Sequence, residues 1–299
     1  MFKIHFRYAL VYWVACLLLF SCESRPARQP ETTTLTVTDD LGRKVTIPRF
    51  PRRIMALAPS ETEMIYAVAD EKNIVGRTQN CNYPVQVKNK PVVNNYPMDY
   101  EKLVLLKPDL VFTVKGLTSA EEAARIQELH IPVYYQKFAK VEDIFRGLTD
   151  IGRLLHREDK AKTVVDSLRQ ALSLLQVHSV AGAKPQVLAI TWPDPIYVYG
   201  QNTIFTDKLW YIGAENAVKE ILAQPYPALT REYILKLNPD VIIGGTFEKM
   251  DATFFKLYPE LKQVKAYQNK KIFAATDDLI ARPSPRVVSS IRELKRFIR

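Results

Sequence analysis

Residues 101–112 read EKLVLLKPDLVF, and residues 232–243 read EYILKLNPDVII. Each stretch starts with a glutamate, continues with an apolar helical pattern and reaches a Pro-Asp pair, at the same spacing, before a short apolar run. The residue before a proline disfavours helix, so each unit predicts a helix that ends at the Pro-Asp turn and leads into a buried strand. Such a unit also occurs singly in α/β proteins, but the matched glutamate favours an internal duplication and therefore two similar lobes.

Strand-like and helical stretches alternate on both sides of these units. The other strand candidates are residues 54–59, 73–77, 133–138, 186–192 and 271–276. This alternation predicts parallel sheets covered by helices, and residues 35–47 indicate a hairpin in front of them. Ser60 and Glu63 have the pattern of a capping box at the start of the next helix.

A long amphipathic pattern separates the two halves. Residues 158–180 carry apolar side chains, among them Ala161 and Leu172, at three- and four-residue spacings, which predicts one helix. The predicted fold is therefore α/β, with an N-terminal lobe over residues 35–157 and a C-terminal lobe over residues 181–299. Mostly parallel sheets covered by helices form the lobes, and one long bridging helix joins them as a stiff connection.

The first residues predict export and a lipid anchor. Two basic residues precede an apolar run over residues 9–20 that is shorter than the roughly 20 residues of a membrane-spanning helix, so residues 1–21 are typical of a secretion signal. The box that ends at Cys22 resembles a lipoprotein signal-peptidase site, whose cysteine is acylated and holds the protein at a membrane surface. Residues 22–34 are polar and contain proline, as expected of a tether. The predicted location is the periplasmic side or the cell surface.

The remaining composition argues against several classes of function. Cys81 is the only thiol left after processing, so no intrachain disulfide is expected. The net charge of +10 is dispersed without a basic run, which indicates solubility and attraction to anionic membranes, not nucleic-acid binding. No serine-hydrolase, phosphate-loop or zinc-protease motif is present, so we expect neither an enzyme nor a resident metal or cofactor. An exported two-lobed enzyme that uses Asp277 and Asp278, or a purely structural lipoprotein, is the distant alternative.

Several motifs together point to one family. They are TDDLGRKVTIP (38–48), PRRIMALAPSETE (51–63), VGRTQNCNYP (75–84), YGQNTIFTDKLWYIGAENA (199–217), ARPSPR (281–286) and the two Pro-Asp units. With these motifs the chain resembles the solute-binding proteins of ABC importers for vitamin B12, heme and ferric siderophores, and most of all the vitamin B12-binding members. The resemblance implies a monomer with its ligand in the cleft between two lobes and a permease dimer as partner.

The same resemblance gives the two repeated glutamates a role. Glu101 and Glu232 match the positions that dock into arginine pockets of the two permease subunits. Docking onto a two-fold transporter requires such a pseudo-symmetric pair. The alternative is purely local, because an acid in the first turn of a helix stabilises the helix dipole.

Ligands in such folds lie beyond the carboxyl ends of the strands, so the loops there are the candidate ligand contacts. In the first lobe these loops contain Asn80 and Tyr83, and Asn95 and Tyr96. They match binding loops of the B12-type members, although those members carry aromatic residues where this chain has Asn80 and Asn95.

In the second lobe, Trp192 stands at the end of the predicted strand over residues 186–192, and Tyr197 lies in the same segment. A tryptophan face can stack on a flat macrocycle; a buried core tryptophan is the alternative. Asp278 and Arg282 match polar ligand contacts of the B12-type members, while a mutual pair in a solvated loop is the alternative for them. Arg286 is expected to serve the start of the last helix.

The predicted ligand is cobalamin. The neutral amide fringe of a corrinoid suits one acid and one base among aromatic residues, whereas anionic heme or a catecholate siderophore would favour several converging arginines. Heme or a ferric siderophore is the alternative, since Tyr83 or Tyr96 could be an axial ligand of heme.

Overall fold

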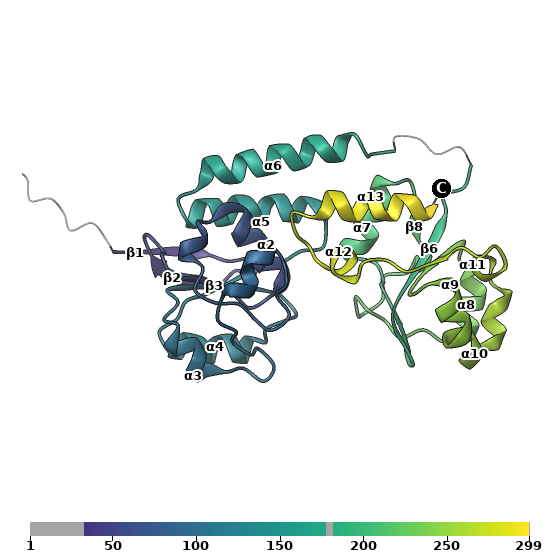
Figure 1. Cartoon of the computed structure of the whole chain (residues 1–299), viewed down its shortest axis with the longest axis horizontal. Coiled ribbons are helices and arrows are strands. Elements are labelled where there is room, and N and C mark those ends of the chain that lie inside the picture. Colours follow the sequence, from purple (N-terminus) through teal and green to yellow (C-terminus); the bar gives the residue numbers. More distant parts are fainter. Residues whose placement is uncertain (1–32, 178–181, 299) are drawn as a thin grey trace, which may run out of the picture. The chain divides into compact units, whose positions relative to one another are not determined.

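The structure is a computed structural model that describes residues 33–177 and 182–298. The predicted signal peptide, Cys22 and nearly all of the predicted tether lie outside the described residues, as do residues 178–180 of the predicted bridging helix. The predicted α/β fold class is confirmed (Figure 1).

The first lobe is built on a parallel sheet of three strands in the order β3-β4-β5, preceded by an antiparallel hairpin, β1-β2. The strands are β1 (Thr34–Thr38), β2 (Lys44–Pro48), β3 (Ile54–Ala56), β4 (Leu110–Val114) and β5 (Val133–Gln136). The helices are α2 (Pro59–Val68), η1 (Glu71–Asn73), η2 (Val85–Asn89), α3 (Tyr100–Leu105), α4 (Ala120–Glu128) and α5 (Val141–Leu154). The predicted hairpin is thus confirmed.

The second lobe contains a sheet of five strands. Its order is β10-β9-β6-β7, with β8 paired to β6; β7 is antiparallel to β6, and the other pairs are parallel. The strands are β6 (Gln186–Pro193), β7 (Ile196–Val198), β8 (Glu215–Asn216), β9 (Val241–Ile243) and β10 (Ile272–Phe273). The helices are α7 (Ile204–Tyr211), α8 (Arg231–Leu237), α9 (Phe247–Ala252), α10 (Phe254–Leu257), η3 (Pro259–Gln263), α11 (Lys265–Gln268), α12 (Asp277–Ala281) and α13 (Val287–Ile298).

The sheets of the two lobes are each covered on two faces, because successive strand residues point to opposite sides. In β6, Val187 belongs to a cluster with residues of α7 and α13, whereas Leu188 belongs to a cluster with residues of α8 and α10. In β3, Ile54 packs with residues of α2 and α5, and Met55 with residues of α3 and α4. Continuous apolar strands of this kind are what a sheet covered on both faces requires.

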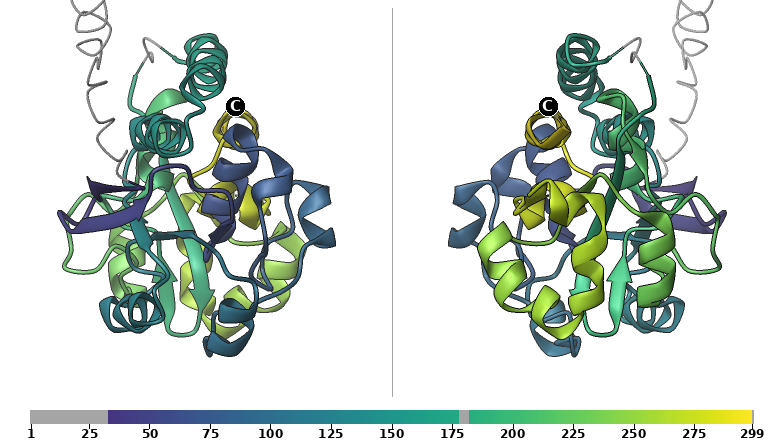
Figure 2. Two further views of the ribbon diagram at one scale, coloured as in Figure 1. Left: turned by 90° about the vertical axis from the view of Figure 1, so that its left-hand side faces the viewer. Right: turned by 90° about the vertical axis from the view of Figure 1, so that its right-hand side faces the viewer.

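The lobes share one hydrophobic cluster. It includes Ile65 of α2, Leu148 of α5, Phe205 of α7 and Ile291 of α13. Helix α6 (Glu158–Ser173), the bridging helix, packs along α5, and the two are seen nearly end-on in Figure 2. Helix α6 ends before the predicted boundary, and Val177 then donates from its backbone N–H to the carbonyl of Tyr211. The connection is therefore a helix reinforced by a common core.

The two Pro-Asp units form the same local structure. Asp109 donates its backbone N–H to the carbonyl of Arg53 (2.7 Å), and Asp240 donates its own to that of Gln186 (2.9 Å). The carboxylates return the contact, because Asp109 accepts from the Arg53 N–H (3.0 Å) and Asp240 accepts from the Gln186 N–H (2.9 Å). In each lobe the aspartate thus ties its own strand to the start of the neighbouring strand.

Two local predictions are wrong. Residues 73–77 make only isolated bridges, because the chain leaves Ile54 after Val75 and pairs through Arg77 with residues 91–93. The capping box is absent as well, since helix α2 starts at Pro59, with Ala58 as its N-cap and no side-chain cap. Proline fits the first helical position, so the helix begins earlier than the polar residues suggested.

Candidate ligand site

A tightly held loop at one end of the first-lobe sheet carries Asn80, Asn82 and Tyr83. Arg77 Nη1 donates to the carbonyls of Thr78, Gln79 and Cys81 from within the loop. The buried Cys81 Sγ lies 3.1 Å from the hydroxyl oxygens of both Thr62 and Thr78. The loop backbone is therefore fixed, and Asn82 and Tyr83 extend from it as exposed side chains.

Asn95 and Tyr96, the two predicted ligand residues of the neighbouring loop, differ in their surroundings. Asn95 Nδ2 donates to the carbonyl of Leu57 (3.0 Å), so in this structure its amide joins the loop to the end of β3. Tyr96 is 87% exposed, and its phenol is available to a ligand. The ligand roles of both remain predictions.

In the second lobe, Asp278 and Arg282 contact one another and also reach the first lobe. Arg282 Nη2 lies 2.6 Å from Asp278 Oδ1, which is the mutual pair considered as the alternative. Asn82 Nδ2 donates to Asp278 Oδ2 (2.8 Å), and Arg282 Nη1 donates to Asn82 Oδ1 (2.7 Å). Arg282 Nη2 also donates to the carbonyl of Asn80 (3.3 Å). These residues therefore form a connection between the lobes, not a separate solvated pair.

Glu63 is the centre of this connection, and the sequence analysis missed it. Its side chain is 1% exposed; Oε1 accepts from Arg282 (3.0 Å), and both oxygens accept from Arg286. The guanidinium of Arg286 also lies over the ring of Tyr83, 4.4 Å from its centroid. The capping-box role predicted for Glu63 is therefore wrong. Arg286 does stand at the start of α13, where its carbonyl accepts from the Ser290 N–H, and its side chain binds the other lobe in addition.

A buried lysine supports the second-lobe side. Lys208, on α7, donates from Nζ to the carbonyls of Leu279 (2.8 Å) and Ile280 (2.9 Å) in α12. Burial lowers the pKa of Lys208 to about 7, and the nearby Glu63 opposes this shift. Lys208 thus clamps the helix that carries Asp278 and holds the position of Arg282.

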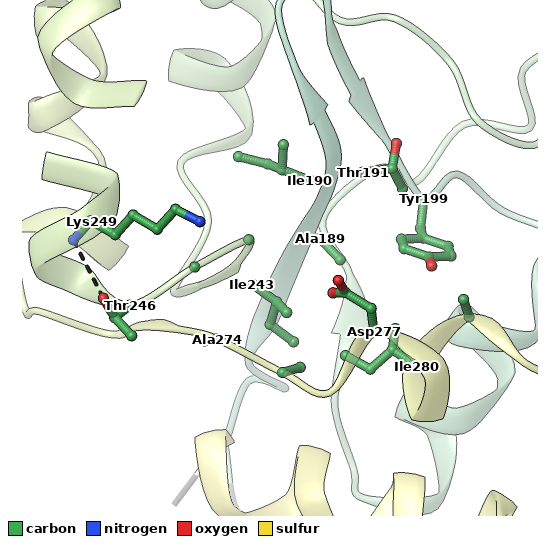
Figure 3. A pocket seen from close by; sticks show the side chains of 14 residues that line it. Ala189, Ile190, Thr191, Tyr199, Ile243, Thr246, Lys249, Ala274, Asp277 and Ile280 are labelled. Carbon is green, nitrogen blue, oxygen red and sulfur yellow. Dashed lines mark hydrogen bonds between the residues drawn. The ribbon is translucent and has the colours of Figure 1, made fainter. Parts of the chain in front are cut away.

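A cavity of about 550 Å³ lies at the carboxyl ends of β6, β9 and β10 (Figure 3). Its lining includes Thr191, Tyr199, Lys249 and Asp277, with small residues behind them. Lys249 from α9 and Asp277 from α12 point toward the hollow from opposite sides. The cavity thus lies beyond the strand ends, where a ligand is expected, yet none of the eight predicted ligand residues lines it. The size falls within the usual range of about 300–1,000 Å³ for small-molecule pockets.

Trp192 and Tyr197 lie opposite each other on the hairpin formed by β6 and β7. Trp192 is 60% exposed and Tyr197 39%, so the alternative of a buried core tryptophan is wrong. Trp192 Nε1 donates to the carbonyl of Asp194 (2.8 Å), which fixes the indole on the surface. The pair presents aromatic faces to the solvent.

Glu101 and Glu232 occupy equivalent positions in the two lobes. Each is the second residue of its helix, after the N-caps Asp99 and Thr230, and each is exposed. Hydrogen bonds from its own backbone N–H and from Thr230 lower the pKa of Glu232. Both residues lie at the surface, and the docking role remains a prediction.

Among the helices of residues 33–177 and 182–298, none combines the length and the apolar character that a membrane span needs. The same part of the chain holds no group of three or more histidine, cysteine or acidic residues arranged to bind a metal ion.

Comparison with known proteins identifies the family of this chain. Residues 54–279 match the model of the family described as periplasmic binding protein. An uncharacterized ABC transporter substrate-binding lipoprotein of Bacillus subtilis is 28% identical, over 95% of this chain and 94% of its own length. Its name agrees, at the level of the family, with the prediction that the chain is not an enzyme.

Solved structures show the same fold. The periplasmic vitamin B12-binding protein of Vibrio cholerae is 21% identical, with a TM-score of 0.72 over 83% of this chain and 96% of that one. A periplasmic heme-binding protein of Pseudomonas aeruginosa is 19% identical, with a TM-score of 0.72 over 83% of this chain and 93% of that one. With the family match over residues 54–279, the resemblance inferred from the motifs is confirmed, and the chain belongs to the periplasmic binding protein family.

Proposed function

We propose that this chain is the lipid-anchored substrate-binding protein of an ABC importer, that it binds a corrinoid such as cobalamin between its lobes, and that it delivers the ligand to a permease dimer. The observation that carries the choice of ligand is the pairing of Arg282 with Asp278 and Glu63. Arg286 shares Glu63, so two guanidinium charges are balanced by two carboxylates, and the site favours a neutral, hydrogen-bonding ligand over an anionic one.

The exposed aromatic residues support a flat, largely apolar ligand body. Trp192 and Tyr197 lie side by side on one hairpin, and Tyr96 extends from the first lobe. Aromatic faces bind large planar molecules through apolar contact. A corrin ring with a fringe of amides fits both the aromatic and the hydrogen-bonding groups.

Heme is the second candidate ligand, and two observations favour it. Tyr96 is 87% exposed, and a tyrosine phenolate can ligate heme iron. Lys249, which makes no ion pair with another described residue, could accept one heme carboxylate.

The ligand is tested with the mature chain that lacks the acylated cysteine. Cyanocobalamin, hemin and a ferric catecholate are titrated separately, with absorbance and tryptophan fluorescence as readouts. We expect micromolar or tighter binding of cyanocobalamin alone. Tight hemin binding that the Tyr96→Phe substitution abolishes would instead establish heme, and failure of all three compounds would refute the ligand class.

The anchor has its own test. Cys22 is expected to carry the acyl chains, which would keep the exported protein at a membrane. In cells, Cys22→Ser should move the protein from the membrane to the soluble fraction and stop incorporation of labelled palmitate. Unchanged labelling would contradict the assignment of Cys22.

A further inference from the structure

Asn82, Asp278 and Arg282 form a closed ring of two hydrogen bonds and one ion pair across the two lobes. Asn82 uses both ends of its carboxamide: Nδ2 donates to Asp278 Oδ2 (2.8 Å), and Oδ1 accepts from Arg282 Nη1 (2.7 Å). Asp278 Oδ1 and Arg282 Nη2, 2.6 Å apart, close the ring. One acceptor and one donor of the second lobe are thus both satisfied by a single primary amide.

The second-lobe pair does not depend on Asn82 for its position. Arg282 is also held by Glu63 at 3.0 Å, where Glu63 is 1% exposed. Lys208 binds the carbonyls of Leu279 and Ile280, between the two residues of the pair. If Asn82 left, Asp278 and Arg282 would therefore remain in place, with one acceptor and one donor free.

Asn82 is the replaceable member of the ring. Its side chain is exposed, whereas Arg282 is 12% exposed and Asp278 is 32% exposed at the side chain. The loop beneath it is fixed by Arg77 and Cys81, so Asn82 can rotate away without unfolding its surroundings. An exposed amide over a less exposed donor and acceptor is the arrangement that a competing ligand amide can displace.

We propose that Asn82 stands in for a primary carboxamide of the ligand, and that ligand binding exchanges the internal amide for the external one. The inference rests on the proposed function and deepens it, because it names the chemical group that Asp278 and Arg282 recognise. The contact of Asn82 with Asp278 and Arg282 then competes with the ligand for the same two groups. The apparent dissociation constant is then the intrinsic one divided by the fraction of molecules in which Asn82 has left the pair.

The test compares the wild type, Asn82→Ala and the control Asn89→Ala. Asn89 is exposed in the adjacent η2 helix, and its side chain makes no hydrogen bond with another described residue. Association and dissociation of cyanocobalamin are followed by stopped-flow fluorescence. We expect cyanocobalamin to associate with the Asn82→Ala variant roughly three to ten times faster than with the wild type, and to dissociate at the same rate, since only the competing amide of Asn82 is removed. Asn89→Ala should match the wild type.

A second ligand tests whether the primary amide is the group that the site recognises. Dicyanocobyrinic acid heptamethyl ester has a corrin ring whose side chains are esters, so it lacks primary amides. We expect weaker binding of this ester, with no gain from Asn82→Ala. If the wild type binds cyanocobalamin but Asn82→Ala associates no faster, or dissociates faster, the inference is overturned while the proposed function stands. If none of the three proteins binds cyanocobalamin, both the proposed function and the carboxamide ligand are refuted.

Discussion

Arg286 Nε lies 2.7 Å from Glu63 Oε2, and this contact joins the start of α13 in the second lobe to α2 in the first. The same carboxylate binds Arg282, so one buried acid balances two guanidinium groups from the other lobe. Behind it, the shared hydrophobic cluster joins α2, α5, α7 and α13. The two lobes are therefore fixed both by a common core and by a buried ion cluster.

The ion cluster predicts a large loss of stability when its centre is neutralised. Glu63→Gln would leave Arg282 and Arg286 without their shared carboxylate, and breaking a buried ion pair from one side costs about 3–5 kcal/mol. We expect a decrease of this size in the free energy of unfolding by urea. Glu128→Gln, at an exposed glutamate of α4, is the matched control and should change little. Equal stabilities of the two variants would contradict the assigned role of Glu63.

Glu61 predicts an unusual dependence of stability on pH. It is fully buried, and its carboxylate has no hydrogen-bond partner among the residues that the structure describes; burial, followed by the charge of Asp40, raises its pKa well above 4.5. Below this ordinary value the carboxyl is protonated in both the folded and unfolded states, so it costs nothing. As the pH rises from about 4.5 through the folded-state pKa, only the unfolded chain ionises freely, and stability is lost.

Glu61→Gln should therefore be more stable than the wild type at pH 7.5 and no more stable near pH 4. At pH 7.5 the raised pKa of the buried carboxyl in the folded state opposes the ionisation that the unfolded chain gains, and the amide is free of this loss. Urea unfolding of both proteins at pH 4, 6 and 7.5 measures the difference. A difference that does not vary with pH would show that Glu61 is not the titrating group.

The features of the fold that were predicted correctly depend on local patterns of residues. The repeated Pro-Asp units, the hairpin and the parallel strands follow from spacing along the chain, and each is present. The contacts of the site are different in kind, because Glu63 and Arg282 are 219 residues apart, and nothing in the surroundings of either indicates the other. The capping motif predicted a local backbone partner for Glu63. That contact is not made, because the helix begins earlier, at Pro59.

The matched aspartates predict a loss of stability in each lobe, larger for Asp109, which also accepts the backbone N–H of Arg52 (2.9 Å). Asp109 and Asp240 each accept a backbone N–H at the start of a neighbouring strand. Asp109→Ala and Asp240→Ala should each lower the free energy of unfolding by about 1–3 kcal/mol, because a backbone donor loses its partner. Asp166→Ala, which removes only an exposed helical ion pair with Lys162, is the control. A loss for one aspartate alone would show that the two units are not equivalent.

The matched glutamates predict a defect in transport without one in binding. Glu101 and Glu232 hold the same helical position and are exposed, so substitution should leave the fold and the ligand contacts intact. If each enters an arginine pocket of the permease, the Glu101→Arg/Glu232→Arg double variant places like charges in both pockets. Uptake of labelled ligand by cells should then be abolished, while titration of the purified variant gives the wild-type affinity.

Single variants separate docking from a local effect on the helix dipole. Docking through a pseudo-symmetric pair predicts that each single charge reversal weakens uptake and that the double reversal weakens it further. An acid that only stabilises its own helix predicts a small loss of stability and ordinary uptake. Glu128→Arg, which reverses an exposed charge elsewhere in the first lobe, controls for net charge. Normal uptake by the double variant would refute docking, and the repeat would then reflect only the duplicated fold.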